Sequence, residues 1–150
     1  MLKGLDPLLN GEILNVLRSM GHGDDLVVCD TNFPGDSVAR QTAWGRPIRM
    51  DGVGAAGAVA AVLSVMPLDS FVPHPAERME VVGEPDTIPA VQAEVQAAID
   101  AAEGKPSPMG SVERFAFYER AKKAYAVLIT GERRFYGCFL LKKGVIPPDA

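Results

Sequence analysis

Hydrophobic residues recur at helical spacing near the start of the chain. Five of them fall on one face of a helix with 3.6 residues per turn: Leu9, Ile13, Val16, Leu17 and Met20. Pro7 suits a first helical turn and Asp6 can cap it, so the helix is expected to begin there. Gly21 is then in position to end the helix in a left-handed conformation.

Short apolar runs predict the strands. Residues 26–29 form a continuous apolar run, which is typical of a strand buried on both faces. Weaker signals predict further strands at residues 48–50, 79–82, 126–129 and 136–141. A turn near Gly131 separates the last two strands, so they are expected to pair as a hairpin.

Three more segments have the composition and spacing of helices: residues 55–66, 87–102 and 114–124. Gly104 follows the second of these helices and is expected to close it. Helices thus alternate with short buried strands, which predicts an α/β fold with a mixed sheet. A length of 150 residues is typical of one domain, and we expect that domain to span residues 1–150.

Charge and apolar content exclude several classes of partner. The net charge is −4 and no basic run exceeds two residues, so no nucleic-acid partner is expected. The most apolar stretch, residues 53–68, falls short of the roughly 20 residues of a membrane span. The N-terminus lacks the apolar core of a secretory signal. Cys29 and Cys138 are expected to be reduced thiols, which favours a cytoplasmic location.

A glycine motif offers a competing interpretation. Residues 52–57 match G-x-G-x-x-G, the pattern that brings a backbone close to a dinucleotide pyrophosphate. The preceding strand is short and contains Arg49 and Asp51, and Asp69 lies too near the glycines to be the usual ribose-binding acid. Close packing of a helix of small residues is the better interpretation, and no organic cofactor or metal is expected.

His22 is the best candidate for proton-transfer chemistry. It lies between two glycines, which permit unusual backbone geometry and close approach of a ligand. Asp30 ends the first buried strand, where ligands of open α/β sheets collect. The other histidine, His74, stands between prolines and is expected to be structural.

Polar side chains also recur in the last third of the chain. Arg114 and Tyr118 are four residues apart in a predicted helix and should share a face. Tyr136 and Cys138 begin the last predicted strand, where ordinary packing would also explain them. Histidine, aspartate, arginine and tyrosine together suit a neutral ligand with many hydroxyl groups.

In these motifs the sequence resembles the family of fucose mutarotases and ribose pyranases. The matching segments, in chain order, are residues 20–24 (MGHGD), 30–34, 49–52, 67–69, 114–124, 130–132, 136–137 and 141–145. The helical motif and LKKGV at residues 141–145 favour the fucose branch. The segment from Gly83 to Ser111 contributes little to the resemblance.

The resemblance implies a three-layer α/β/α sandwich with a mostly parallel sheet, and ring-shaped homo-oligomers, often decamers. It implies sugar sites at subunit interfaces, where His22 donates a proton and Tyr118 assists. Asp30, Asp69, Arg114 and Tyr136 would bind the monosaccharide. The implied reaction is interconversion of the α and β anomers of L-fucose or a related sugar.

One departure affects substrate choice. The family usually has asparagine two residues after the tyrosine, whereas this chain has Cys138, a weak hydrogen-bonding group that would stand at the sugar site. Two alternatives stay open: interconversion of pyranose and furanose ribose, and a non-catalytic sugar-binding protein.

Overall fold

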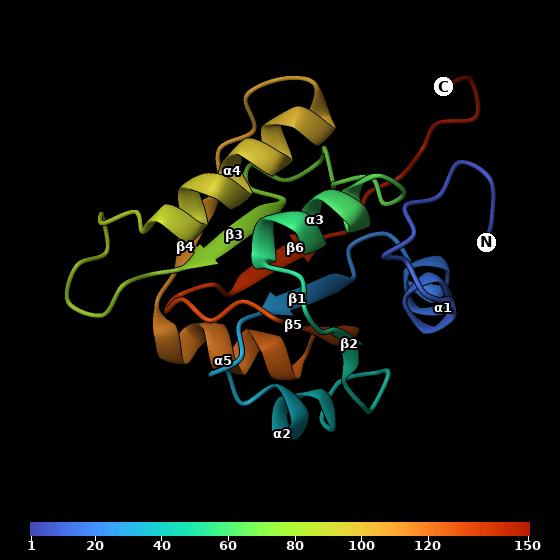
Figure 1. Ribbon diagram of the computed structural model, residues 1–150. Helices are drawn as coiled ribbons and strands as arrows, with labels where there is room; N and C mark the ends of the chain where they lie inside the picture. Colours follow the sequence, from blue (N-terminus) through green and yellow to red (C-terminus); the bar gives the residue numbers. More distant parts are fainter.

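Six strands form one mixed sheet at the centre of the computed structural model, which describes all of residues 1–150 (Figure 1). The strands are β1 (Asp25–Cys29), β2 (Ile48–Met50), β3 (Ala76–Met79), β4 (Gly110–Val112), β5 (Ala126–Thr130) and β6 (Phe139–Lys142). Their order across the sheet is β2-β5-β1-β6-β3-β4. Only β6 runs against its neighbours β1 and β3, and the other pairs are parallel. The predicted mixed, mostly parallel sheet is therefore confirmed.

Helices cover both faces of this sheet. They are α1 (Gly11–Ser19), α2 (Gly35–Ala39), α3 (Ala55–Leu63), α4 (Ala90–Glu103) and α5 (Arg114–Lys122). In Figure 1, α3 and α4 lie over one face, while α2 and α5 lie under the other. This arrangement confirms the three-layer α/β/α fold.

Each face of the sheet packs against its own hydrophobic core. Leu26 and Val28 of β1 belong to the larger core, together with residues of α1, α3 and α4. Val27 and Cys29 point to the smaller core, together with residues of α2 and α5. Because successive side chains of a strand alternate between faces, a strand buried on both sides is apolar throughout.

The first helix begins later than its sequence pattern predicts. Asn10 is the N-cap, with its side chain accepting a hydrogen bond from the Ile13 amide, and Asp6 instead caps a preceding turn at the Leu8 amide. Leu9 is buried although it lies outside the helix. At the other end the left-handed glycine is Gly23 (φ 85°) rather than Gly21.

The predicted hairpin between the last two strands is wrong. β5 and β6 lie on opposite sides of β1, which pairs with β5 in parallel and with β6 antiparallel. A chain that crosses over β1 in this way brings the start of β6 to the edge of the sheet where β1 and β5 end. The segment 131–138 is therefore a crossover connection rather than a tight turn.

The middle of the chain also differs from expectation. β3 covers Ala76–Met79 instead of residues 79–82, because the chain turns away at Gly83 (φ 78°) and leaves Val82 exposed. The three-residue strand β4 and the short helix α2 lie in segments for which the sequence pattern predicts neither a strand nor a helix. The last strand begins at Phe139, three residues later than predicted.

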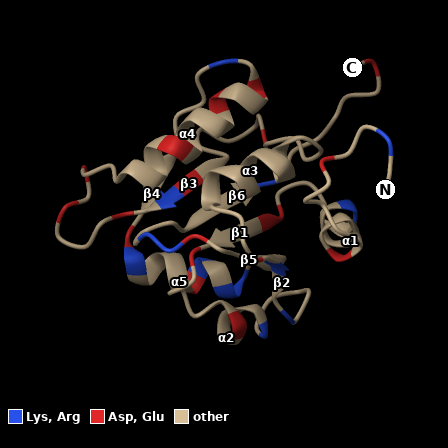
Figure 2. Cartoon of the chain, viewed as in Figure 1, with Lys and Arg blue, Asp and Glu red and all other residues tan.

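Charged residues are spread over the chain. Figure 2 shows acidic and basic residues dispersed over the visible helices, strands and loops. No helix has both the length and the apolar character needed to cross a bilayer.

Candidate functional site

Five of the seven predicted site residues line one pocket at the carboxyl edge of the sheet. The pocket has a volume of about 230 Å³, below the roughly 300–1,000 Å³ of pockets for drug-sized ligands, which favours a small ligand. Its lining residues are Asp30, Asn32, Phe33, Met79, Arg114, Tyr118, Phe135, Tyr136 and Cys138. They gather because β1, β3 and β4 end at this edge while β6 begins there.

Helix α5 supplies a donor pair to the pocket. Arg114 and Tyr118 share a face of α5, as their four-residue spacing predicted, and the Arg114 Nε donates a hydrogen bond to the Tyr118 hydroxyl oxygen at 3.0 Å. This contact raises the pKa of Arg114 above its ordinary value. Because the hydroxyl oxygen accepts from Arg114, its own hydrogen is free to be donated to a ligand. Phe33 packs against the Tyr118 ring, with centroids 5.4 Å apart, and helps to hold it.

Asp30 connects the two loops that form the pocket. Its Oδ1 accepts hydrogen bonds from the amides of Asn32 and Phe33, and its Oδ2 accepts from the amide of Gly137 and the thiol of Cys138. The residue is only 4% exposed. Asp30 is therefore at the predicted place, but most of its hydrogen-bonding capacity is used within the chain.

Cys138 contributes a protonated thiol to the pocket wall. Burial, together with the neighbouring Asp30 carboxylate, raises the pKa of this thiol well above its ordinary value. Cys29, also a free thiol, is buried on the same side of the sheet, and burial raises its pKa too. A neutral thiol is a weak donor, which fits its long 3.4 Å contact with Asp30.

A buried carboxylate behind the pocket carried no specific prediction from the sequence. Glu132 accepts hydrogen bonds from the Ala55 amide at the start of α3 and from the backbone and side chain of Arg134. The Arg134 contacts lower the pKa of Glu132 to about 2. Arg134 also forms a two-point ion pair with Glu94 of α4. This network fastens the loop before β6 to two helices.

The same contacts explain the glycine motif. Gly54 caps α3, and a side chain there would crowd the Glu132 carboxylate. The helix N-terminus that would hold a pyrophosphate in a dinucleotide fold is thus occupied by the protein's own anion. The motif serves packing, as the sequence analysis favoured.

The other two predicted residues lie at the opposite edge of the sheet. The Nε2 atom of His22 is 3.1 Å from the Asp69 Oδ1. The His22 side chain is 46% exposed, whereas that of Asp69 is 4% exposed. A hydrogen bond from the Phe71 amide and the contact with His22 lower the pKa of Asp69, and the Phe71 ring lies 5.5 Å from the imidazole.

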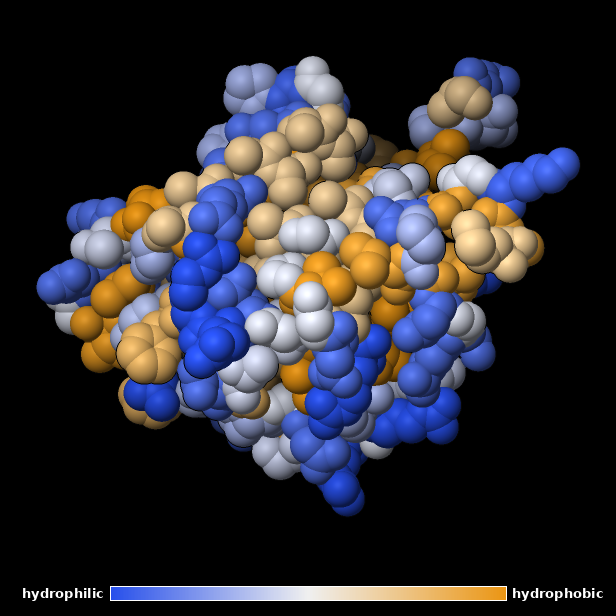
Figure 3. All heavy atoms as spheres, viewed as in Figure 1, coloured by the Kyte–Doolittle hydropathy of each residue, from blue (hydrophilic) through white to orange (hydrophobic).

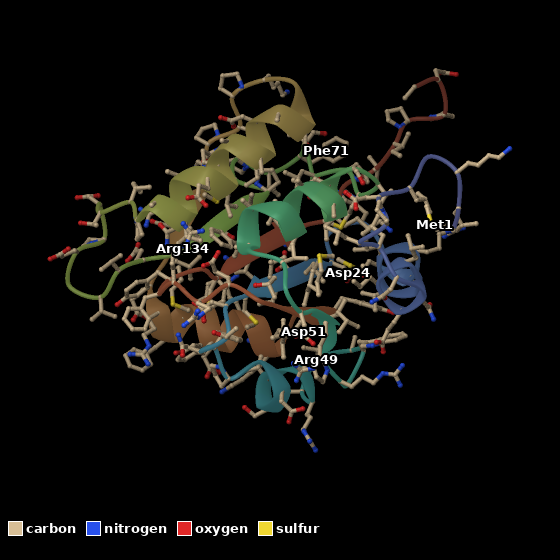
Figure 4. The ribbon with its side chains drawn as sticks, in the orientation of Figure 1. Met1, Asp24, Arg49, Asp51, Phe71 and Arg134 are labelled. Atoms are coloured by element: carbon tan, nitrogen blue, oxygen red, sulfur yellow. The ribbon has the colours of Figure 1, made fainter.

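The loop that holds His22 is fixed from the end of β6. The Gly23 amide donates to the Lys143 carbonyl, while the Lys143 ammonium donates to the Leu17 and Met20 carbonyls at the end of α1. Burial lowers the pKa of Lys143. In Figure 4, Asp24 and Phe71, which flank this region, are well separated from Arg134 beside the pocket.

The sheet separates the two groups of residues. Asp24 directly precedes the five-residue strand β1, and Asp30 directly follows it. At about 3.3 Å per residue the strand is about 16 Å long, so the two groups lie at least that far apart along the sheet. The pocket and the His22–Asp69 pair of one chain therefore cannot contact the same small ligand. His74 is exposed, with its Nδ1 near the Pro108 carbonyl, and it forms no hydrogen bond with a residue of either group. No three His, Cys, Asp or Glu side chains are grouped so as to hold a metal ion.

These features define a three-layer α/β/α protein with a small polar and aromatic pocket at the carboxyl edge of its sheet. Residues 3–146 match the model of the RbsD / FucU transport protein family. The chain is 42% identical over 147 residues to the L-fucose mutarotase of Actinobacillus pleuropneumoniae serotype 5b, covering 98% of this chain and 99% of that protein. The chain therefore belongs to the RbsD / FucU family.

Two solved structures show the same fold. The crystal structure of protein Atu2016 superposes with a TM-score of 0.96 at 62% identity, covering 98% of this chain and 97% of the other. The structure of the fucose mutarotase from Streptococcus pneumoniae in complex with L-fucose gives a TM-score of 0.86 at 36% identity, covering 97% and 100%.

Proposed function

We propose that this protein is a monosaccharide mutarotase that interconverts the α and β anomers of L-fucose or a closely related sugar. Full-length similarity to proteins named fucose mutarotases supports the reaction. The observation that carries the proposal is the His22–Asp69 pair, a half-exposed imidazole oriented by a buried carboxylate. Such a pair suits proton transfer to and from a ligand.

The reaction needs only proton transfers around one bond. A base removes the proton of the anomeric hydroxyl, the bond between C1 and the ring oxygen breaks as a C1 carbonyl forms, and an acid protonates the ring oxygen. Rotation about the C1–C2 bond and the reverse steps close the ring on the other face. The protons taken up and released cancel, so no net acid or base is consumed.

Each side chain has a distinct role in this mechanism. His22 transfers the proton because its ring nitrogens can both accept and donate one, and Asp69 orients its ring. Tyr118 assists by donating its free hydroxyl hydrogen, and Arg114 and Tyr136 bind sugar hydroxyls. Asp30, with little exposed surface, acts chiefly by shaping the pocket, and Cys138 forms part of the wall.

A complete site then requires two copies of the chain. The pocket of one copy and the His22–Asp69 pair of another would enclose a single sugar, in a homo-oligomer for which a ring-based decamer is our proposal. Exposed apolar residues near the His22 edge support such an interface: Met1, Leu2, Phe71, Val145 and Ile146. Figure 3 shows hydrophobic surface beside the N-terminal segment.

The chain is further proposed to act as one sugar-binding domain over residues 1–150, in the cytoplasm. The sheet takes strands from residue 25 to residue 142, which supports one domain. Two free thiols, both buried, are consistent with a reducing compartment.

Exchange NMR on anomeric protons tests the function. L-Fucose, D-ribose and D-galactose are incubated in parallel with catalytic amounts of protein. Faster α/β exchange of L-fucose is the expected result. Acceleration with D-ribose alone would favour a pyranase, and binding without acceleration of any sugar would favour a non-catalytic sugar-binding protein.

A further inference from the structure

Tyr136 has an unusual backbone conformation for its residue type. With φ at 61° it is the only non-glycine residue in the left-handed region. A bulky side chain in this region is strained, and the conformation persists only where surrounding contacts hold it. Tyr136 lines the pocket, so the contacts that hold its backbone also determine where its ring and hydroxyl stand.

The peptide group between Tyr136 and Gly137 is held from both sides. Its carbonyl oxygen accepts a hydrogen bond from the Gln92 Nε2 at 3.0 Å, and its amide donates to the Asp30 Oδ2 at 3.0 Å. A side chain at Gly137 would approach the Glu132 Cγ to 2.8 Å, so this glycine permits the close packing of the loop. A peptide group held by both its polar atoms fixes the ψ of Tyr136.

Gln92 itself is fully buried in α4, and both of its polar side-chain atoms have hydrogen-bond partners. Its Nε2 also donates to the Met79 carbonyl at 2.7 Å, and its Oε1 accepts from the Arg78 Nη1 at 3.2 Å. Arg78 is itself buried and donates to the Pro85 carbonyl. A buried amide with three partners has one geometry, because any rotation would leave a polar atom unpaired.

We propose that Gln92 is a positioning residue that sets sugar affinity by holding Tyr136 in its left-handed conformation. The inference rests on the proposed function for its effect on sugar, and on geometry alone for its effect on Tyr136. Gln92 touches the backbone of two pocket residues, Met79 and Tyr136, but it does not line the pocket. Helix α4 thereby influences the pocket without contacting the ligand.

Gln92→Met tests this inference because methionine has a side chain of similar length and removes all hydrogen bonds of the Gln92 side chain. The expected result is a rise in the KM for L-fucose of up to about tenfold, the equivalent of one lost hydrogen bond, with kcat changed much less. Gln96→Met is the matched control one turn along α4. Gln96 binds Asp100, Ser107 and Met109 and has no contact with Tyr136, so KM should stay unchanged.

Two further measurements separate positioning from general loss of stability. In a Tyr136→Gly background, Gln92→Met should raise KM no further, because the residue it positions is gone. The one-bond Cα–Hα coupling of Tyr136, which reports a positive φ, should change in Gln92→Met and not in Gln96→Met. This coupling requires no sugar, so it still tests the contact with Tyr136 if the wild type accelerates no exchange.

Three results would overturn the inference: an unchanged Tyr136 coupling in Gln92→Met, equal KM values in the Gln92→Met variant and the wild type, or equal KM rises in the two glutamine variants. If the wild type accelerates no exchange but the Tyr136 coupling changes in Gln92→Met as expected, the proposed function is wrong. Gln92 would then still be the residue that holds Tyr136.

Discussion

The two edges of the central sheet hold their polar side chains in different ways. At the carboxyl edge, Asp30 and Glu132 are buried and satisfied by several donors each, so the pocket is rigidly built before any ligand arrives. At the opposite edge, His22 has one carboxylate partner and is half-exposed. Under the proposed function, one edge binds the sugar and the other exchanges protons, so neither is sufficient alone.

Removing the exposed imidazole should have the largest effect. His22→Ala is expected to lower kcat for anomer exchange by about 10²- to 10⁴-fold, the usual contribution of a positioned acid or base. The fold should persist, because the His22 side chain is 46% exposed and outside both cores. NMR exchange rates and circular dichroism check both statements.

His74→Ala is the matched control for that variant. The only other histidine is exposed and forms no hydrogen bond with His22, Asp69 or a pocket residue, so its removal should leave exchange unchanged. Activity near wild type in His22→Ala would remove His22 from the mechanism.

At the pocket edge, the largest effect should be on stability and its pH dependence. The pKa of Glu132 is lowered from 4.5 to about 2 in the fold, so its carboxylate stabilises the fold above pH 4.5. That stabilisation is lost as the pH falls from 4.5 toward 2. Glu132→Gln should therefore lower the free energy of unfolding at pH 7 by at most about 3 kcal/mol, the value equivalent to the pKa shift. The difference in the free energy of unfolding between this variant and the wild type should shrink as the pH approaches 2.

Urea unfolding at pH 7 and at low pH measures this difference. Glu94→Gln is the control, because its ion pair with Arg134 is exposed on both sides and should contribute little. A stability gap between Glu132→Gln and wild type that is the same at both pH values would contradict the role assigned to the buried carboxylate.

The smallest expected effect concerns the pocket wall. Cys138→Asn replaces a weak donor by an amide and should lower the KM for L-fucose by no more than about tenfold, the range of one hydrogen bond. Cys29→Ala, at a buried thiol outside the pocket, should leave KM unchanged. Equal KM values for Cys138→Asn and Cys138→Ala would show that the introduced amide forms no hydrogen bond with a sugar hydroxyl.

Local patterns predicted most elements but not their neighbours in space. The strand at residues 26–29 and the small-residue helix α3 could be predicted from composition, because an element that is buried on several sides must consist of apolar residues. The hairpin was wrong because the insertion of β1 between β5 and β6 is a long-range choice that no local residue encodes. β4 was missed because three residues form a strand only through their pairing with β3.

The same distinction applies to the site. The four-residue spacing of Arg114 and Tyr118 predicted that they share a helix face, since helix geometry is local, and their hydrogen bond follows from that placement. The placement of His22 and Asp69 at the far edge depends on strand order, so residue motifs alone could not separate the two groups. Gln92 carried only a weak signal, a polar residue next to Val91 on a face that α4 buries.

The central claim is that one sugar site combines the pocket of one copy with His22 of another. Two variants that are each expected to lower the exchange rate, His22→Ala and Tyr118→Phe, test it when they are co-expressed and purified as mixed oligomers. Random assembly in equal amounts should restore roughly a quarter of wild-type exchange, because that share of sites receives both intact residues from different copies. Mixed oligomers that stay as inactive as either variant alone would contradict a site shared between copies.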